Sequence, residues 1–493
     1  MNRREFLKCV GAGAAGAMLG AGARAMWAQP APSTKAAGPY LVVKAPSDVV
    51  AGKAFTVEVV PLTPAGDLHR NYTGKLSLTV EGQAGAPISI ELKDQSLIPE
   101  GKPADQFKKG TAQVSVPKPG FYRLVVTDGE ATVGFPVKCH AAEPKEKLYW
   151  GEIHCHSDAD KDAVHGGGSL DPARAFSWGR NVACLDFGSI VCHHWSFDEK
   201  RWLEIARIIN AADDPGKFVA LMAWEFGQGD RPGERINHNN VYFLGDSAPW
   251  PPNMGSIDEF WPWLEKNSKA PTLCIPHHTA FQQIRTEWKT HNPKYQQLVE
   301  VFSTHGNSEC EGDAFPGVCT WKPGYVHNAL EKGYFLGFIC GSDNHGGRLG
   351  TNSRVGCRAG GKRTGLAAFR APELTRKALF QTIQDRNTYG TSGAQRIILE
   401  VSMNGHRGGE KFAAGTDPRK LSVEVAGTAD IAKIEVVKNA KVVHSVEGKS
   451  WHEKMEFADK ADRATDWYYV RVTQTDDNLA WSSPIWARSD GRG

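Results

Sequence analysis

The sequence predicts a central α/β domain with a β-sandwich on either side of it. Residues 39–140 and 395–487 alternate apolar and polar side chains, with Gly, Pro and Asp at short intervals, which is typical of a sandwich's short strands. Residues 148–393 alternate short apolar runs with helical stretches, which predicts a parallel α/β layout. About six or seven repeats of that unit favour a barrel. A chain of 493 residues has room for two or three domains.

Residues 1–25 are similar to a twin-arginine signal peptide. Arg3 and Arg4 precede a weakly apolar stretch rich in Gly and Ala, and Ala23-Arg24-Ala25 offers small residues at a cleavage site. The apolar stretch is too short and too rich in Gly to span a bilayer comfortably, although a cytoplasmic helix or a membrane anchor is the alternative. We therefore expect a cleaved leader, a linker at 26–38, and a soluble periplasmic or secreted protein without a membrane anchor.

The expected elements follow from apolar periodicity. In the first sandwich, alternating runs lie at 40–43, 54–60, 75–80 and 121–126, and residues 141–147 form a polar boundary. The α/β domain has strand-like runs at 149–154, 185–192, 218–224, 272–276, 298–302 and 335–340. Its helical stretches lie at 171–180, 198–212, 256–267, 323–332 and 372–386, with Asp198 and Ser256 as N-caps. The second sandwich has runs at 397–401, 433–437 and 467–472.

Composition excludes several classes of protein. Hydrophobic residues make up 41% and charged residues 23%, which is ordinary for a globular protein. The net charge is +3, part of it in the leader, and no long basic run predicts nucleic acid or an anionic membrane as a partner.

The cysteines do not predict a disulfide framework. Of ten cysteines, Cys9 lies in the leader, so an odd number remains, and no C-x-x-C pair occurs. Cys310 and Cys319 flank one loop and could form a local disulfide in an oxidising compartment. Four cysteines in apolar runs are expected to be small buried hydrophobes: Cys184, Cys192, Cys274 and Cys340.

Histidines and carboxylates follow six of the strand-like runs. In chain order these residues are His154 and His156, His193 and His194, Glu225, His277 and His278, His305, and then Asp343 and His345. Because parallel strands of a barrel open on one face, we expect these side chains to share one rim. A single strand-end histidine is usually structural, but six similar strand ends are hard to explain by chance. Imidazole with carboxylate suits Zn, Mn or Fe, and the number of ligands predicts two or three ions.

The opening His154-x-His156 and the closing Gly341-Ser342-Asp343-Asn344-His345 resemble the PHP (polymerase and histidinol phosphatase) superfamily. The resemblance covers residues 148–393. It is closer to an exported branch usually described as a domain of unknown function, in residues 185–187, 224–225, 239–243 and 480–486. It implies a distorted (βα)7 barrel and a hydrolase, most often a phosphoesterase, with two or three metal ions.

The resemblance also implies roles for individual residues. His154 and His156 would hold one metal with Asp343, and Glu225 would bridge two metals. The other metal sites would be filled by His193, His277 or His278, and His305, with His345 beside Asp343. His165 would be a further ligand or a loop residue that meets substrate, and His238 would face the substrate or bind metal. The family's usual Asp-His at the second strand end is Cys192-His193 here, so either His193 or His194 could point inward.

The expected chemistry is hydrolysis by a metal-bridging hydroxide. A histidine that binds no metal, such as His194, His238 or His278, could protonate the leaving group. Arg348 is followed by Arg354, Arg358 and Lys362, which form either a solvated loop or a clamp for an anionic substrate.

Three functions are compatible with these patterns. The leading hypothesis is an exported phosphoesterase acting on a small anionic substrate. The second keeps the metals but acts on a carboxylic or sulfate ester, a lactone or an amide. The third is a metal-binding cell-surface or carbohydrate-binding protein without catalysis, which Cys192 leaves open. Trp451 and Trp467 could bind a glycan but are better explained by core packing.

Overall fold

The structure is a computed structural model that describes residues 40–95, 107–161, 169–196, 198–228, 236–252, 254–312, 315, 317–352 and 363–489. The expected leader and linker lie outside these residues, as do His165, Arg354, Arg358 and Lys362. Gly38–Gly493 form one compact unit, so its division into three domains stays a prediction. Among the described residues, none of the helices has the length and apolar character needed to cross a membrane.

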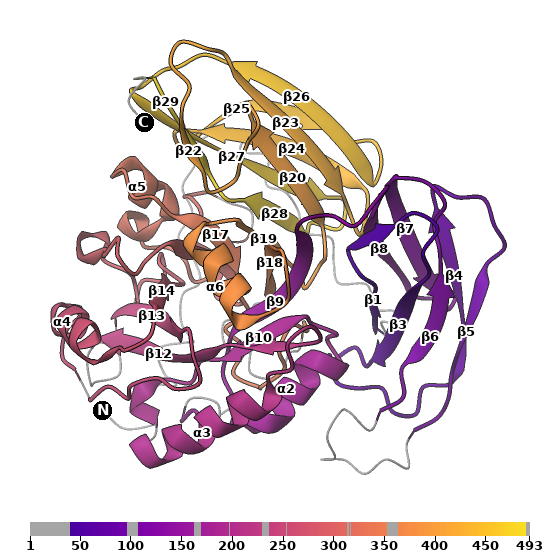
Figure 1. The fold of residues 1–493 in the computed structure, drawn as a ribbon, viewed down its shortest axis with the longest axis horizontal. Coiled ribbons are helices and arrows are strands. Elements are labelled where there is room, and N and C mark those ends of the chain that lie inside the picture. The colour runs from indigo at the N-terminus through magenta and orange to yellow at the C-terminus, as the bar shows by residue number, and fades with distance from the viewer. Residues whose placement is uncertain are drawn as a thin grey trace, which may run out of the picture. The chain divides into compact units, whose positions relative to one another are not determined.

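Residues 40–140 form two sheets around a shared apolar core (Figure 1, indigo and purple). One sheet has the order β1 (Tyr40–Lys44), β3 (Phe55–Leu62), β6 (Gly110–Val114). The other has the order β2 (Asp48–Val50), β8 (Thr132–His140), β7 (Gly120–Thr127), β4 (Gly74–Glu81), β5 (Ile88–Leu92). Alternate residues such as Val57, Leu78 and Leu124 point into the core, as the period of two requires.

The C-terminal strands also form two sheets, one of which continues into the centre of the molecule (Figure 1, yellow). The separate sheet has the order β21 (His406–Arg407), β20 (Ile398–Met403), β23 (Arg419–Ala426), β26 (His452–Asp459). The continuous sheet contains β22 (Lys411–Ala413), β24 (Ile431–Lys438), β25 (Lys441–Glu447), β27 (Thr465–Gln474), β28 (Leu479–Ser482) and β29 (Ile485–Arg488). In this sheet β28 pairs with β19 (Thr388–Ser392), which joins the C-terminal strands to the central region by backbone hydrogen bonds.

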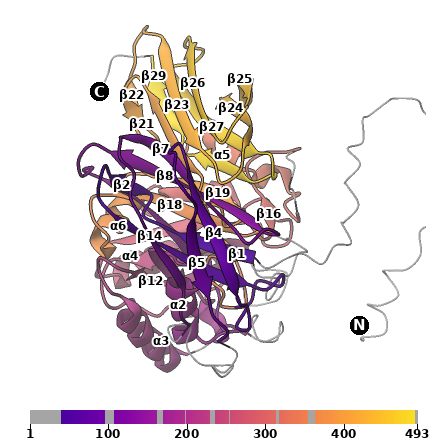
Figure 2. The same ribbon diagram turned by 90° about the vertical axis from the view of Figure 1, so that its right-hand side faces the viewer.

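The central region is mixed α/β with much sheet. Its parallel pairs are β9 (Lys147–Cys155) with β10 (Phe187–Ile190), β10 with β11 (Val219–Ala220), and β15 (Leu298–Ser303) with β17 (Gly337–Cys340). The two-residue strand β16 (Gly306–Asn307) pairs with β15. Figure 2 faces the N-terminal sheets, with α2 (Pro172–Asn181) and α3 (Glu199–Ala212) below them in that view.

The expectation of a parallel layout holds for the three pairs above and is wrong in two places. The strands β12 (Met222–Gln228), β13 (Ile236–Phe243) and β14 (Thr272–Pro276) are antiparallel, and β18 (Gly365–Ala371) is antiparallel to β9 and β19. The connection between β12 and β13, residues 229–235, is shorter than the dozen or so residues that a parallel crossover needs. The strands of the central region therefore belong to three separate hydrogen-bonded sheets.

The helices end close to their expected bounds where caps are strong. Asp198 accepts a hydrogen bond from the Arg201 backbone and Ser256 accepts one from Glu259, which confirms both N-caps, of α3 and of α4 (Ile257–Asn267). The helices α5 (Val326–Glu331) and α6 (Arg376–Gln384) begin later than expected. A short 3₁₀ turn at Lys322–Gly324 precedes α5, and Thr375 caps α6.

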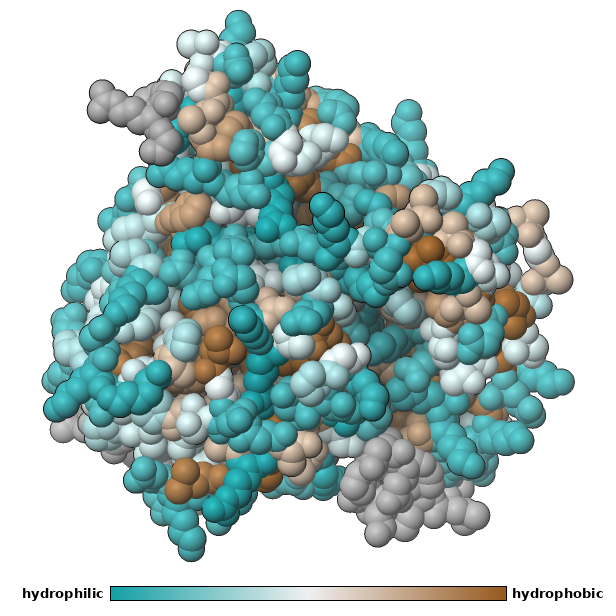
Figure 3. Space-filling model, viewed as in Figure 1, coloured by the Kyte–Doolittle hydropathy of each residue, from teal (hydrophilic) through white to brown (hydrophobic). Residues whose placement is uncertain are grey.

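The surface does not carry a large apolar face in the view of Figure 3, where hydrophilic residues predominate and apolar ones lie in small patches. The exposed large hydrophobic residues of the described chain are Tyr40, Leu203, Val442 and Val443.

Candidate metal centre

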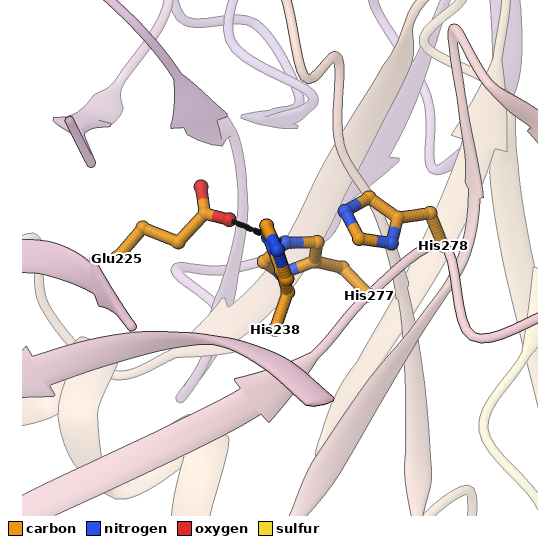
Figure 4. Close-up of side chains that lie close together, drawn as sticks. All are labelled: Glu225, His238, His277 and His278. Atoms are coloured by element: carbon orange, nitrogen blue, oxygen red, sulfur yellow. Dashed lines mark hydrogen bonds and ion pairs between the residues drawn. The ribbon is translucent and has the colours of Figure 1, made fainter. Parts of the chain in front are cut away.

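Glu225 and three histidines form the first group of possible metal ligands (Figure 4). Glu225 lies on β12 and His238 on β13, while His277 and His278 directly follow β14. The register of β13 pairs Asn240 with Glu225 on one side and Asn239 with Pro276 on the other, which brings the four residues together. Oε1 of Glu225 is 2.5 Å from Nδ1 of His238 and 3.0 Å from Nε2 of His277.

Strand alternation explains why Glu225 faces this group. Its neighbours Trp224 and Phe226 belong to the apolar core, so the side chain between them points to the other face of β12. His278 has a φ of 35°, in the left-handed region that few residues other than glycine adopt. Such backbone conformations are found at binding sites where surrounding structure holds them.

The second group consists of His154, His156 and Asp343. The two histidines lie two residues apart at the end of β9, so both rings point to one side. Oδ1 of Asp343 is 3.4 Å from Nε2 of His154 and 3.2 Å from Nε2 of His156. Oε2 of Glu225 lies 3.2 Å from Nε2 of His156, so Glu225 faces the first and second groups at once. Asp343 also has a positive φ, 53°.

The third group shares His156 with the second and adds His193 and His345. The rings of His156 and His345 stack with centroids 4.1 Å apart, and those of His156 and His193 lie 4.7 Å apart. His305 stands beside these groups, with Nε2 2.8 Å from Oδ2 of Asp343. All nine expected ligands except His165, which is outside the described residues, are therefore gathered around Glu225 and Asp343.

Several polar atoms at the centre have no hydrogen-bond partner although they are buried. They are Nε2 of His154, Nε2 of His156, Nε2 of His238 and Oε2 of Glu225. A buried polar atom without a partner costs about 1–3 kcal/mol, so such atoms are rare in folded proteins. Here they converge from three strands, β9, β12 and β13, on one place, which is the arrangement that a metal ion would satisfy.

The structure separates His193 from His194. His193 lies in the third group, whereas the Nδ1 of His194 contacts the backbone oxygen of Glu225 at 3.2 Å and its ring stacks on Phe226. His194 belongs to none of the groups that could hold a metal. Burial lowers its pKa to about 3, so it is neutral at physiological pH and unsuited to the expected role of proton donor.

Two buried carboxylates that we did not expect in the site hold the ligand histidines. Oδ2 of Asp160 lies 2.8 Å from Nδ1 of His156 and 2.6 Å from Nδ1 of His193. Oε2 of Glu300 lies 2.8 Å from Nδ1 of His154. Gly341 permits the second contact, because a Cβ there would lie 2.1 Å from Oε2 of Glu300. Glu300 could have been found from the sequence, because it is a charged residue inside an apolar strand, and a buried charge must have a partner.

The charges of the centre shift the pKa values of its members. Burial alone would lower the pKa of the histidines, but Glu300 and Asp343 raise that of His154, and Asp160 and Glu225 raise that of His193 to about 9. Burial would likewise raise the pKa of Glu225, but the neighbouring imidazoles lower it well below its ordinary value. The centre therefore favours ionised carboxylates.

Three other histidines have lowered pKa values. Burial is the main cause for His238, with a pKa of about 4, for His345, with a pKa of about 3, and for His278, where the shift is also strongly downward. Neutral imidazole is the form that binds metal. His238 and His278, which we expected as proton donors, thus fit a ligand role better, and both belong to the first group.

Arg348 does not face the centre as an open anion clamp. Its Nε lies 2.8 Å from Oδ1 of Asp67, in the N-terminal part of the chain, and a terminal nitrogen donates to the backbone oxygen of Gly346 at 3.0 Å. The guanidinium also lies over the ring of Trp178. Part of the guanidinium is therefore already paired with a carboxylate, and a role for Arg348 as an anion clamp stays a prediction.

Cys310 and Cys319 are not joined by a disulfide in the structure, which rules against the local disulfide that their spacing allowed. Cys319 is buried and contacts the Ser308 hydroxyl and the His305 backbone oxygen, while Cys310 is partly exposed. Cys184, Cys192, Cys274 and Cys340 are buried, as expected. Trp467 is buried in one apolar cluster, and Trp451 packs, partly buried, against another.

A fourth cluster of ligand-type residues, Glu309, Cys310 and His327, lies apart from the other three groups. Glu309 is fully buried and accepts hydrogen bonds from Arg471, Tyr469 and the Trp481 indole. His327 contacts the Tyr469 hydroxyl at 2.7 Å. An arginine beside the carboxylate opposes a cation there, so this cluster is a buried polar network and not a metal site.

Comparison with known proteins gives distant matches. The model of a family described as "Protein of unknown function (DUF3604)" matches residues 180–315, the segment from α2 to the loop after β16. An uncharacterized protein of Chlamydia trachomatis is 26% identical over 404 residues, covering 75% of this chain and 62% of the relative. One of Chlamydia pneumoniae is 24% identical over 402 residues, with the same coverage. The chain thus spans less than two thirds of these relatives' length.

Among solved structures, the chain is similar to a two-domain protein from Bacteroides vulgatus that contains a predicted PHP-like metal-dependent phosphoesterase. The sequence identity is 13% and the TM-score is 0.36, with 69% of this chain and 96% of that chain covered.

Proposed function

We propose that this protein is a metal-dependent hydrolase and that phosphoesters are its first substrate class. The observation that carries the proposal is the pair of Nε2 atoms on His154 and His156. They are buried without hydrogen-bond partners and face the carboxylates of Glu225 and Asp343. Imidazole nitrogens and carboxylate oxygens in one buried place are the donor set of Zn, Mn and Fe sites.

The three groups divide the ligands among two or three ions. One ion would be held by His154, His156 and Asp343, and another by Glu225, His277 and neighbouring histidines. Glu225 faces both groups, which fits a bridging carboxylate. His156, His193 and His345 would hold the third. When bound, such ions lower the pKa of a water molecule and neutralise charge on the electrophile.

The protein's own groups set the conditions for that chemistry. The depressed pKa values of Glu225 and Asp343 keep both carboxylates ionised at neutral pH. His305 and His345 are slightly exposed, at 7% and 6%, whereas His154 and His277 are fully buried. A substrate would therefore approach from the side of His305 and His345.

A second substrate class is favoured by the state of Arg348. Because Asp67 holds its guanidinium, this arginine does not supply the positive charge expected for a phosphate. Carboxylic or sulfate esters, lactones and amides are therefore the alternative, with the same metals.

The test is a substrate panel on the chelator-treated protein reloaded with Zn, Mn or Fe. We expect at least two tightly bound ions per chain and release of phosphate or alcohol from a phosphoester, with Asp343→Asn as the inactive control. Turnover of a non-phosphate ester, lactone or amide alone would select the second class. Two bound ions without any turnover would favour the non-catalytic hypothesis, and fewer than two ions would reject the proposal.

Export by the twin-arginine route is part of the same proposal, carried by residues 1–25. In cells with that pathway, the full chain should accumulate in the periplasm in a shortened form. Replacing Arg3 and Arg4 together by Lys should leave it unprocessed in the cytoplasm. Equal export of both forms would reject this part.

The distorted (βα)7 barrel is the structural part of the proposal. A parallel bridge between His193 and Glu225 links the end of β10 to β12, and β14 lies beside β15, which supports closure of the strands around the centre. A crystal structure with metals would test it, and an open sheet there would reject it.

A further inference from the structure

We propose that Asp160 is a positioning residue that orients two metal-binding histidines, His156 and His193, and so couples two metal positions through one carboxylate. The inference rests on the proposed metal centre and adds a residue that is not itself a ligand. Asp160 lies in the loop after β9 and is fully buried.

The first support is that one oxygen of Asp160 contacts both rings. Oδ2 lies 2.8 Å from Nδ1 of His156, 2.6 Å from Nδ1 of His193 and 2.8 Å from the His193 backbone nitrogen. A histidine that donates Nδ1–H to a carboxylate presents the lone pair of Nε2 to a metal, and this partner also fixes the ring's rotation.

The second support is that the opposite nitrogens face the centre. Nε2 of His156 lies 3.2 Å from Oε2 of Glu225, and Nε2 of His193 lies 3.3 Å from Oε1 of the same residue. Each ring thus stands between Asp160 on one side and Glu225 on the other. Because His156 belongs to the second and third groups, rotation of its ring would disturb both.

The third support is that Asp160 is itself held in place. Its Oδ1 accepts a hydrogen bond from the Ser196 hydroxyl at 2.8 Å, so both oxygens have partners other than a cation. Ser196 follows His193 by three residues, so this contact anchors Asp160 to the same segment that carries the ligand.

Cys192 packs against the same loop after β9 that carries Asp160. Cys192 occupies the position just before His193, and its buried Sγ contacts the Ser157 backbone nitrogen at 3.4 Å and the Ser157 hydroxyl at 3.2 Å. The thiol packs against the loop and offers no carboxylate to His193. The carboxylate that contacts His193 comes from Asp160 in that same loop.

The test compares Asp160→Asn with Asp158→Asn, which removes an exposed carboxylate two residues away in the same loop. Zn²⁺ affinity is measured by chelator competition, and the geometry by the visible spectrum of Co²⁺-loaded protein. We expect about 10–100-fold weaker binding of at least one ion and a changed Co²⁺ spectrum in Asp160→Asn. Asp158→Asn should match the wild type in both.

A second variant keeps the test decisive if Asp160→Asn does not fold. Ser196→Ala removes only the anchor of Asp160, so it should weaken Zn²⁺ binding by a few-fold, in the same direction. Wild-type Zn²⁺ stoichiometry, affinity and Co²⁺ spectrum in whichever of the two variants folds would overturn the inference while leaving the proposed function standing. Failure of the wild type itself to bind metal would instead reject the proposed function.

Discussion

The candidate metal centre and the Glu309 network both bury carboxylate and imidazole groups, but only in the candidate metal centre do buried side-chain atoms of these groups lack a hydrogen bond. In the network, Arg471 contacts both oxygens of Glu309 at 3.1 Å, and the Trp481 indole donates to one of them at 2.7 Å. In the metal centre, Nε2 of His154 and of His156 lack hydrogen-bond partners. Proximity of ligand-type residues therefore does not define a metal site; the buried atoms left unsatisfied do.

The difference has an electrostatic cause. Arg471 carries a permanent charge that neutralises Glu309, and its Nε also pairs with Glu435 at 3.0 Å. Histidines can lose their protons, so Glu225 can exchange imidazolium partners for metal ions. The network ties the segment after β16 to β27 and β28, which is a structural role.

The largest expected effect comes from Glu225→Gln in the metal centre. Glu225 faces two groups, so its loss should lower activity by more than about 100-fold, the upper end for loss of a residue that only supports a ligand. Metal stoichiometry and turnover of the loaded variant measure this. Wild-type stoichiometry and activity would contradict the role of Glu225.

Next is Glu309→Gln in the network, which should cost stability and spare the metals. Removing one partner of a buried ion pair costs about 3–5 kcal/mol, and we expect the lower end because Arg471 keeps Glu435. Denaturant unfolding measures the loss, with Glu331→Gln, which removes the exposed partner of Arg463, as a matched control. Loss of a bound metal in Glu309→Gln would show that the Glu309 network is not purely structural.

The free energy of metal binding should change by about 1.4 kcal/mol per pH unit for each histidine that must lose a proton to bind the metal. The raised pKa of His193, about 9, means that metal displaces a proton at pH 7, so this histidine alone should raise the affinity tenfold per unit up to about pH 9. In the apoprotein, the stability from this protonated histidine is complete below about pH 6.5 and is lost as pH rises through 9.

The rise in melting temperature on adding Zn²⁺ should therefore grow from pH 6 to pH 8. Calorimetry at fixed free Zn²⁺ measures it. A rise that is constant across this range would show that His193 is not displaced from its proton by metal.

The smallest effect is expected for Asp67→Asn, which releases Arg348. The pair is partly exposed on the Asp67 side, 41%, so its loss should cost about 0–1 kcal/mol. Activity toward an anionic substrate should stay within about threefold. A fall in KM of more than about threefold would show that Arg348, once released from Asp67, binds an anionic substrate.

Contacts between residues close in sequence could be predicted, and contacts between distant residues could not. The N-caps Asp198 and Ser256 could be predicted because each cap contacts a backbone nitrogen only three residues further along the chain. The helix α5 begins later than expected because a 3₁₀ turn at Lys322–Gly324 precedes it, and Gly324 of this turn lies against the Thr279 backbone, where a Cβ would lie 2.1 Å from the oxygen. That contact joins residues far apart in sequence, so no local pattern carries it.

The same distinction holds in the site. His154-x-His156 and Asp343-x-His345 stand at strand ends, and the period of a strand shows that each pair can share one side. The strand β13 and its antiparallel pairing with β12 were missed, and with them the place of His238 beside Glu225. Asp160 was missed because its partners include a histidine 33 residues away.

The sequence alone determined which residue types could bind metal and at which strand ends they stand, because strand periodicity and donor chemistry are local properties. Only the tertiary structure decided that His193 and not His194 joins the centre, that Asp67 holds Arg348, and that Glu309 is neutralised by Arg471. These outcomes depend on which groups distant in sequence lie beside each buried side chain. A buried charge must have such a partner, because burying it alone costs much free energy.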